Sequence, residues 1–220
     1  DKFFNTGVTI NNSLSITRSV SGTNLRFSLG NTQTKGIVPT TGLQRSNISF
    51  SFTSDLSRKL KAEGGLNYTI TTRDNPTYSY ADANDNGGFS TIIYGYTQRQ
   101  LDMRNLERFY KDPLGKQRTW NRISWSDGRA NFTDNPYWML NEITQNDKRH
   151  RFFGNIGLTY NFTDNLYLVG KMYGDIYALT TEDRRAKDSH DTPHYKKYNY
   201  DNAAFNYEAR LHYTPKLGDN

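Results

Sequence analysis

Long runs in which apolar and polar side chains alternate are the feature that most limits what this chain can fold into. From Val8 to Val20 the even positions are mostly aliphatic, whereas every odd position is Ser, Thr or Asn. A period of two places successive side chains on opposite faces of an extended strand. The alternation therefore predicts strands with one apolar and one polar face, and an all-β fold.

The same alternation recurs along the chain. It predicts seven strands, near 8–20, 24–35, 44–54, 59–72, 151–162, 166–178 and 200–214. They run about 11 to 14 residues, longer than the usual globular strand of about 5 to 6 residues and long enough for a tilted membrane crossing. Short turns alternate with long loops, of which the longest covers 73–149. Short periplasmic turns and long extracellular loops are typical of outer-membrane barrels.

The composition fits a barrel wall better than a soluble core. Only 34% of the residues are hydrophobic and the mean hydropathy is -0.87, whereas a barrel wall needs apolar side chains on one face only. A soluble β-sandwich is the alternative, but its strands are short and its turns come every 8 to 12 residues or so. We therefore expect a transmembrane antiparallel up-and-down β-barrel segment in the bacterial outer membrane. Seven strands is an odd number and leaves two edges unpaired, so we expect an excerpt of a larger barrel; a self-contained small barrel would need an eighth strand.

Two classes of function are not expected. The net charge is +6, but the basic residues are scattered among 22 acidic ones, which does not indicate a nucleic-acid partner. No nucleophile elbow, zinc-binding histidine motif or phosphate-binding glycine loop is present, so we do not expect an enzyme.

Aromatic residues in the long loop are candidates for binding a substrate or a protein partner. All three tryptophans, Trp120, Trp125 and Trp138, lie there, and Tyr137 precedes the last of them. Exposed rings can stack on sugars or anchor a partner. The alternative is that they form a small core within the loop, and we favour it for most of them because so long a loop must pack on something.

A weak metal signal lies in the same loop. Asp82, Asn84 and Asn86 occupy the first three ligand positions of an EF-hand, and Gly87 follows. The twelfth position is Ile93 instead of Glu, which excludes an EF-hand and leaves a looser Ca²⁺ site as a hypothesis. We expect no other cofactor. His190 and His194 have a helical metal-ligand spacing, but Pro193 breaks any helix there.

Charged side chains on the polar face of the predicted strands should line the pore side of the wall, where a solvated wall is their default role. They are Arg26, Lys61, Glu63, Lys171, Asp175, Glu208 and Arg210.

Several segments stand in a recognisable order: Phe3-Phe4-Asn5-Thr6-Gly7 leading into 11–16, then 23–30, 35–39, 135–142 and 151–158. In that order they resemble one family, the SusC/RagA group of TonB-dependent outer-membrane transporters. The resemblance implies a barrel of about 22 strands with an N-terminal plug, energised through TonB, that imports glycans or peptides captured with a SusD-type lipoprotein. This sequence departs from the pattern by having no plug, no segment that contacts TonB and fewer strands.

The expected function is therefore that of a barrel-wall portion of an outer-membrane importer of oligosaccharides or peptides, surrounded by lipid. The alternative is an exported β-rich surface module that uses the aromatic loop at 73–149 to bind glycan.

Overall fold

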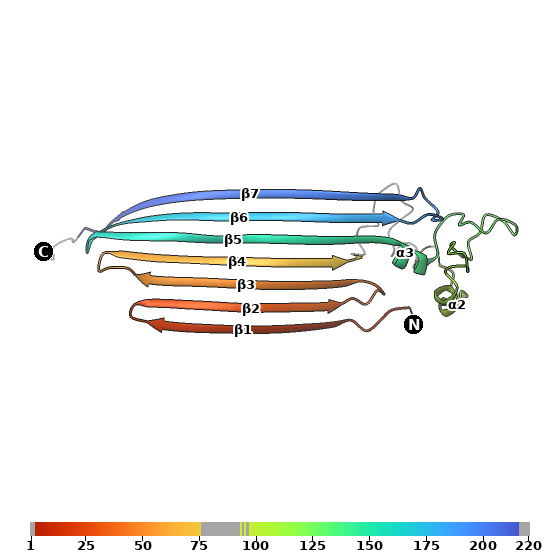
Figure 1. Cartoon of the computed structure of the whole chain (residues 1–220), viewed down its shortest axis with the longest axis horizontal. Coiled ribbons are helices and arrows are strands. Elements are labelled where there is room, and N and C mark those ends of the chain that lie inside the picture. The colour runs from red at the N-terminus through yellow and green to blue at the C-terminus, as the bar shows by residue number, and fades with distance from the viewer. Residues whose placement is uncertain (1–2, 76–92, 94, 96, 216–220) are drawn as a thin grey trace.

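One antiparallel sheet forms most of the molecule, in the computed structural model that describes residues 3–75, 93, 95 and 97–215. Its seven strands lie side by side in chain order, from β1 to β7 (Figure 1). They are β1 Val8–Val20, β2 Thr23–Lys35, β3 Gly42–Asp55, β4 Leu60–Asp74, β5 Ile143–Thr163, β6 Leu166–Arg185 and β7 His194–Tyr213. The predicted all-β, up-and-down fold is confirmed. Within the described residues β1 and β7 are the two edges and the sheet is not closed.

The turn between β1 and β2 shows how local sequence sets the pairing. Val20 pairs with Thr23, so only Ser21 and Gly22 connect the strands. Both have positive φ, 43° and 75°, as a type I′ turn requires, and that turn matches the right-handed twist of the flanking strands. The register set there continues without a shift to Val8 and Lys35.

The last three strands are longer than the alternation predicted. β5 begins at Ile143 and not near 151, β6 continues to Arg185 and not to 178, and β7 begins at His194 and not near 200. In these extensions apolar side chains are few and do not alternate with polar ones, so hydrophobic periodicity cannot reveal them. Cross-strand pairs take its place: Lys197 lies opposite Glu182 in the ladder, and the two side chains are joined by an ion pair of 2.9 Å.

The register gathers the apolar side chains into one band. One row of directly paired residues crosses all seven strands and consists of Leu14, Leu29, Ile48, Tyr68, Phe152, Ile176 and Ala203. On β5 this face stays apolar or Gly from Phe152 to Tyr160, about 27 Å of strand at about 3.4 Å per residue. At a tilt of about 40° that spans about 20 Å, close to the roughly 25 Å apolar belt of outer-membrane barrels.

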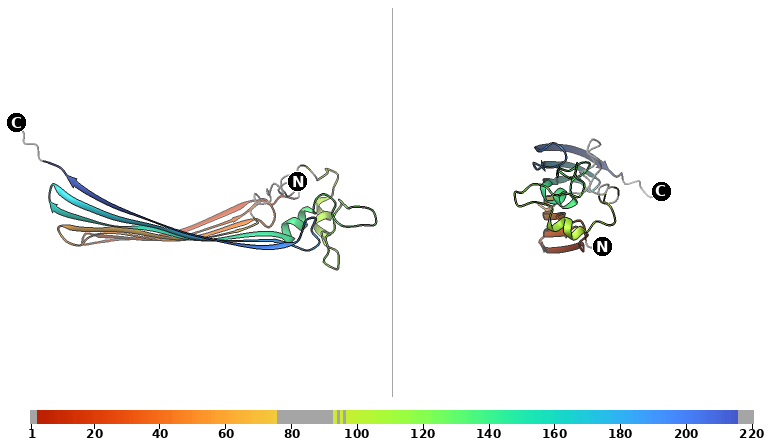
Figure 2. Two further views of the ribbon diagram at one scale, coloured as in Figure 1. Left: turned by 90° about the horizontal axis from the view of Figure 1, so that it is seen from above. Right: turned by 90° about the vertical axis from the view of Figure 1, so that its right-hand side faces the viewer.

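The sheet twists along its length, and the irregular part of the chain lies beyond one end of it (Figure 2). We call residues 97–142 the cap. It contains two short helices, α2 Met103–Arg108 and α3 Pro136–Glu142. In the described part of the chain neither helix has the length and apolar composition that crossing a membrane would require.

Candidate functional site

The apolar face of the sheet is a large exposed surface. Ile16, Ile156 and Leu211 are 60%, 53% and 66% exposed although they lie in regular strands. Water-soluble monomers rarely expose contiguous apolar patches larger than a few hundred Å². This face therefore has the chemistry of a surface that lipid or another apolar partner covers.

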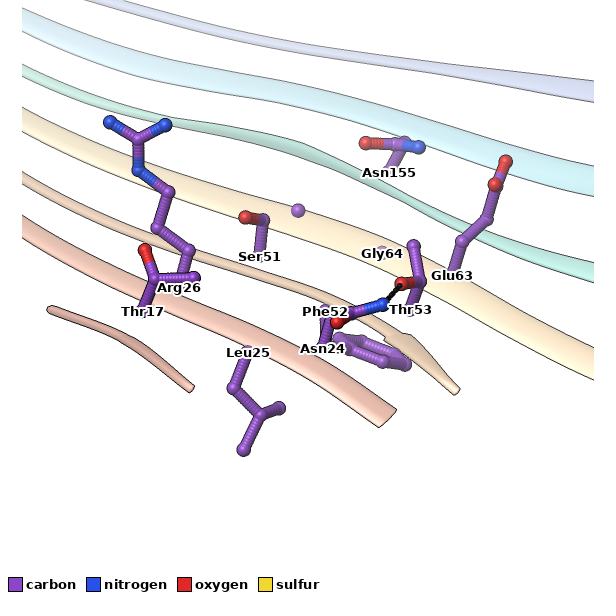
Figure 3. Close-up of a pocket in the computed structure, with 11 residues that line it drawn as sticks. Thr17, Asn24, Leu25, Arg26, Ser51, Phe52, Thr53, Glu63, Gly64 and Asn155 are labelled. Carbon is purple, nitrogen blue, oxygen red and sulfur yellow. Dashed lines mark hydrogen bonds between the residues drawn. The ribbon is translucent and has the colours of Figure 1, made fainter. Parts of the chain in front are cut away.

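The opposite face is polar and carries all seven of the charged residues predicted for the pore side. The pairing register of the strands places these seven side chains on the same side of the sheet. Figure 3 shows Arg26, Ser51, Glu63 and Asn155 pointing to one side of the sheet and Leu25 pointing to the other. A shallow hollow of about 430 Å³ lies among them.

A glycine lets two of these charges meet across a strand. Glu63 and Lys171 lie on β4 and β6, and Gly157 of β5 separates them in the same row of the ladder. Their charged atoms are 2.5 Å apart. A Cβ at Gly157 would lie 3.2 Å from the Cγ atoms of both side chains. Because Gly157 has no side chain, the side chains of Glu63 and Lys171 can meet above β5.

A second ion pair on the polar face is held by two parallel hydrogen bonds. Arg151 on β5 donates from Nε to Oδ1 of Asp175 at 2.9 Å and from Nη2 to Oδ2 at 2.6 Å. The guanidinium also lies 4.9 Å from the centre of the Phe153 ring. Parallel hydrogen bonds to a carboxylate hold both side chains in one orientation. On the polar face, positively and negatively charged side chains therefore form ion pairs with one another, and the face does not carry charges of one sign alone.

The cap has its own core at the end of the sheet. The buried cluster consists of Phe3, Tyr137, Trp138, Met139, Leu140 and Ile143, with Val38 and Ala186 packed against it. Asn135 caps α3 by accepting a hydrogen bond from the Tyr137 amide at 2.9 Å, and Pro136 begins the helix. The cap therefore packs on the N-terminal segment and on two strand connections.

Buried polar groups complete this packing. Asp134 Oδ1 accepts hydrogen bonds from Gln117 Nε2 and from the His190 amide, each at 2.6 Å. Burial raises the pKa of the Asp134 carboxyl above its ordinary value, and these two hydrogen bonds oppose the rise. Gln117 also donates to the Asp188 carbonyl at 3.0 Å. These bonds fasten the connection between β6 and β7 to the cap.

A second polar contact fastens the connection between β2 and β3. Asn75 donates from Nδ2 to the Leu140 carbonyl at 3.2 Å and to Thr40 Oγ1 at 3.0 Å, and Thr40 itself donates to Leu140 at 3.0 Å. Asn75 is 6% exposed. Its side chain therefore joins the end of β4, the 36–41 turn and α3.

The four aromatic residues that the sequence singled out differ in how deeply they are buried. Tyr137 and Trp138 are 4% and 1% exposed and lie in the cap core, and their predicted role in substrate or partner binding is not tested. Trp125 is 92% exposed at the tip of a hairpin. Trp120 is half-buried and lines a recess in the cap. A binding role for these two stays a prediction.

The predicted metal ligands are not tested. Asp82, Asn84 and Asn86 lie outside the described residues. His194 Nε2 lies 3.3 Å from Asp183, whereas His190 Nε2 lies 3.9 Å from Asp191. Across the described ranges, no three His, Cys, Asp or Glu residues are grouped so that they could hold a metal ion.

Sequence reasoning missed Asn75, Gln117 and Asp134, although they fasten the cap. They lie outside any periodic run, and a buried polar side chain in a loop has the same one-letter signature as a solvated one. The one usable signal was Asn135 followed by Pro136, a helix start.

Comparison with known proteins gives structural matches alone: no family model and no curated protein matches the chain. The matched structures are the RagAB peptide importer in its "closed-closed" state, at 15% identity and a TM-score of 0.66, the RagAB peptide transporter, at 14% and 0.67, and the importer in its "open-open" state, at 15% and 0.68. They cover 96%, 96% and 98% of this chain.

The chain spans 22–23% of the length of the chains it matches. At this low identity the likeness concerns the fold. The seven-stranded sheet and the cap of this protein are therefore similar in fold to a portion of the RagAB peptide importer.

Proposed function

We propose that this chain forms part of the wall of an outer-membrane β-barrel importer, and that the cap belongs to its extracellular face. The observation that carries the proposal is the division of the sheet into an apolar band and an opposite face of matched charges. Lipid would cover the band and an aqueous lumen would meet the charges. The fold shared with the RagAB peptide importer supports this assignment.

In this proposal β1 and β7 pair with further strands of the same barrel. Unpaired backbone N–H and C=O groups each cost several kcal/mol in hydrocarbon, so a free edge within lipid is not sustainable. The apolar side chains of β1, such as Leu14 and Ile16, place that edge at the depth of the band.

We propose peptides as the substrate class, ahead of oligosaccharides, because the matched solved structures are those of a peptide importer. The resemblance to the SusC/RagA family adds two proposed partners, a SusD-type lipoprotein over the extracellular face and TonB as the source of energy.

Spin labels test the orientation of the wall. The chain contains no cysteine, so single labels can be placed at Ile156, on the apolar face of β5, and at its neighbour Asn155, on the polar face. In the whole protein reconstituted in lipid, we expect the label at 156 to be accessible to lipid-soluble oxygen and that at 155 to a water-soluble nickel complex. Equal access to the nickel complex at both positions would refute a membrane wall.

A glycan-binding surface module is the second candidate function, and the exposed ring of Trp125 favours it. It predicts saturable oligosaccharide binding that Trp125→Ala weakens, together with equal spin-label access on both faces of β5. Outer-membrane insertion with no oligosaccharide binding would exclude it.

A further inference from the structure

A preformed recess of about 590 Å³ lies in the cap. The cap itself lies beyond the end of the sheet (Figure 1). One wall is the turn between Lys111 and Gln117, and the other is the hairpin between Arg122 and Ala130; each is closed by an antiparallel bridge. Asp112 Oδ1 accepts hydrogen bonds from the Lys116 amide at 2.8 Å, and it also accepts one within the turn at 2.9 Å. The walls are therefore shaped before any ligand arrives.

The lining of the recess is net positive. Four cationic side chains and two carboxylates line it, a balance of 4 − 2 = +2; they are Lys116, Arg118, Arg122 and Arg129, with Asp112 and Asp188.

Two of the cations are already engaged. Arg129 forms a fork with Asp127, with Nη2 at 2.7 Å from Oδ2, and the Arg118 guanidinium lies 5.6 Å from the centre of the Phe109 ring. Lys116 and Arg122 have no carboxylate partner among the residues that the structure describes. These two are the groups that a ligand's anion would meet.

An aromatic wall adjoins the charges. Trp120, half-buried, lines the same recess. Next to it Gln117, 9% exposed, is held by Asp134 and by the Asp188 carbonyl, so this side of the recess is fixed to the cap core. A guanidinium and an ammonium beside an indole suit a carboxylate that is attached to an apolar group.

We propose that this recess binds a carboxylate-bearing peptide, with its carboxylate against Arg122 and Lys116 and an apolar side chain or peptide plane against Trp120. The inference rests on the proposed function and assigns a capture site for its substrate. The two lining carboxylates, Asp112 and Asp188, favour a peptide over an acidic glycan: they can accept hydrogen bonds from peptide N–H or ammonium groups, but they repel a polymer of sugar acids.

Binding of two small peptides to the whole detergent-purified protein tests the site. The probes are labelled Ala-Leu-Glu and a counterpart without carboxylates, Ala-Leu-Gln with an amidated C-terminus. We expect the Lys116→Gln/Arg122→Gln double variant to bind the acidic peptide about tenfold more weakly, since each exposed ion pair contributes up to about fivefold, and to bind the amide unchanged. Arg104→Gln, at an exposed position on α2 outside the recess, should change neither affinity.

Three results would overturn the inference: wild-type protein that binds both peptides equally, a double variant with unchanged affinity for the acidic peptide, or tighter binding of a glucuronate oligosaccharide than of the peptide. Peptide uptake by cells that carry the wild-type protein separates the two proposals. Uptake without charge-dependent binding refutes the recess alone, whereas charge-dependent binding without any uptake refutes the importer.

Discussion

Trp138 shows how strongly one residue of the cap is committed to packing. It is 1% exposed, and its Nε1 donates to Ser189 Oγ at 2.9 Å. Trp138→Ala should cost the cap about 3–5 kcal/mol of local stability, the usual range for a buried Trp replaced by Ala. Hydrogen exchange across 97–142 in the whole protein measures this loss. Trp125→Ala, at a site 92% exposed, is the matched control and should leave protection unchanged; equal protection in both variants would contradict the burial.

Asp134 gives the cap a pH dependence of defined sign. Burial raises its pKa above the ordinary value of 3.8, so the folded cap binds this proton more tightly than the unfolded chain does. Cap stability should therefore fall as the pH rises from about 3.8 through the raised pKa, and stay lower above it.

Two substitutions at Asp134 test this dependence. Asp134→Asn keeps an oxygen for the Gln117 and His190 donors and removes the charge, so the cap should lose this dependence and resist proteolysis better at pH 7. Asp134→Ala leaves both donors without their acceptor and should cost about 1–3 kcal/mol. A cap that is weaker in the Asn variant at pH 7 would show that the ionised form is the favoured one.

At the scale of the strands, the face on which a residue lies determines how much stability is lost when a charge is introduced there. Phe50 belongs to the apolar band and its neighbour Ser49 to the polar face. Phe50→Lys should destabilise the folded protein in lipid by about 2–4 kcal/mol, the cost of Lys near the middle of a barrel's lipid face, whereas Ser49→Lys should cost less than about 1 kcal/mol. Urea unfolding from lipid vesicles compares the two; similar losses would mean that lipid does not cover this face.

At the scale of the whole molecule, the edges of the sheet distinguish a barrel from a free sheet. If β1 and β7 pair with further strands, the amides of both should exchange as slowly as those of β4 and β5, which are paired on both sides. Hydrogen exchange of the whole protein in lipid measures this. Fast exchange along one face of β1 or β7, with slow exchange in β4, would show a free edge and contradict the proposed barrel.

The sequence by itself determined which face of each strand is apolar, because in a period of two a slip of one residue would move Leu14, Ile48 or Phe152 to the other face. The seven charges assigned to the polar face followed from that assignment. The sequence favoured internal packing for most loop aromatics but could not separate the buried rings of Tyr137 and Trp138 from the exposed ring of Trp125.

Only the tertiary structure decided the rest. The polar extensions of β5 to β7 depend on cross-strand partners such as Glu182 and Lys197, which carry no hydrophobic period. The Glu63–Lys171 contact depends on a glycine from a third strand, about 90 residues away from the first of them along the chain and adjacent in the sheet. The cap core and its recess join segments that are distant in sequence, and the free energy of such contacts depends on three-dimensional proximity, which local pattern does not encode.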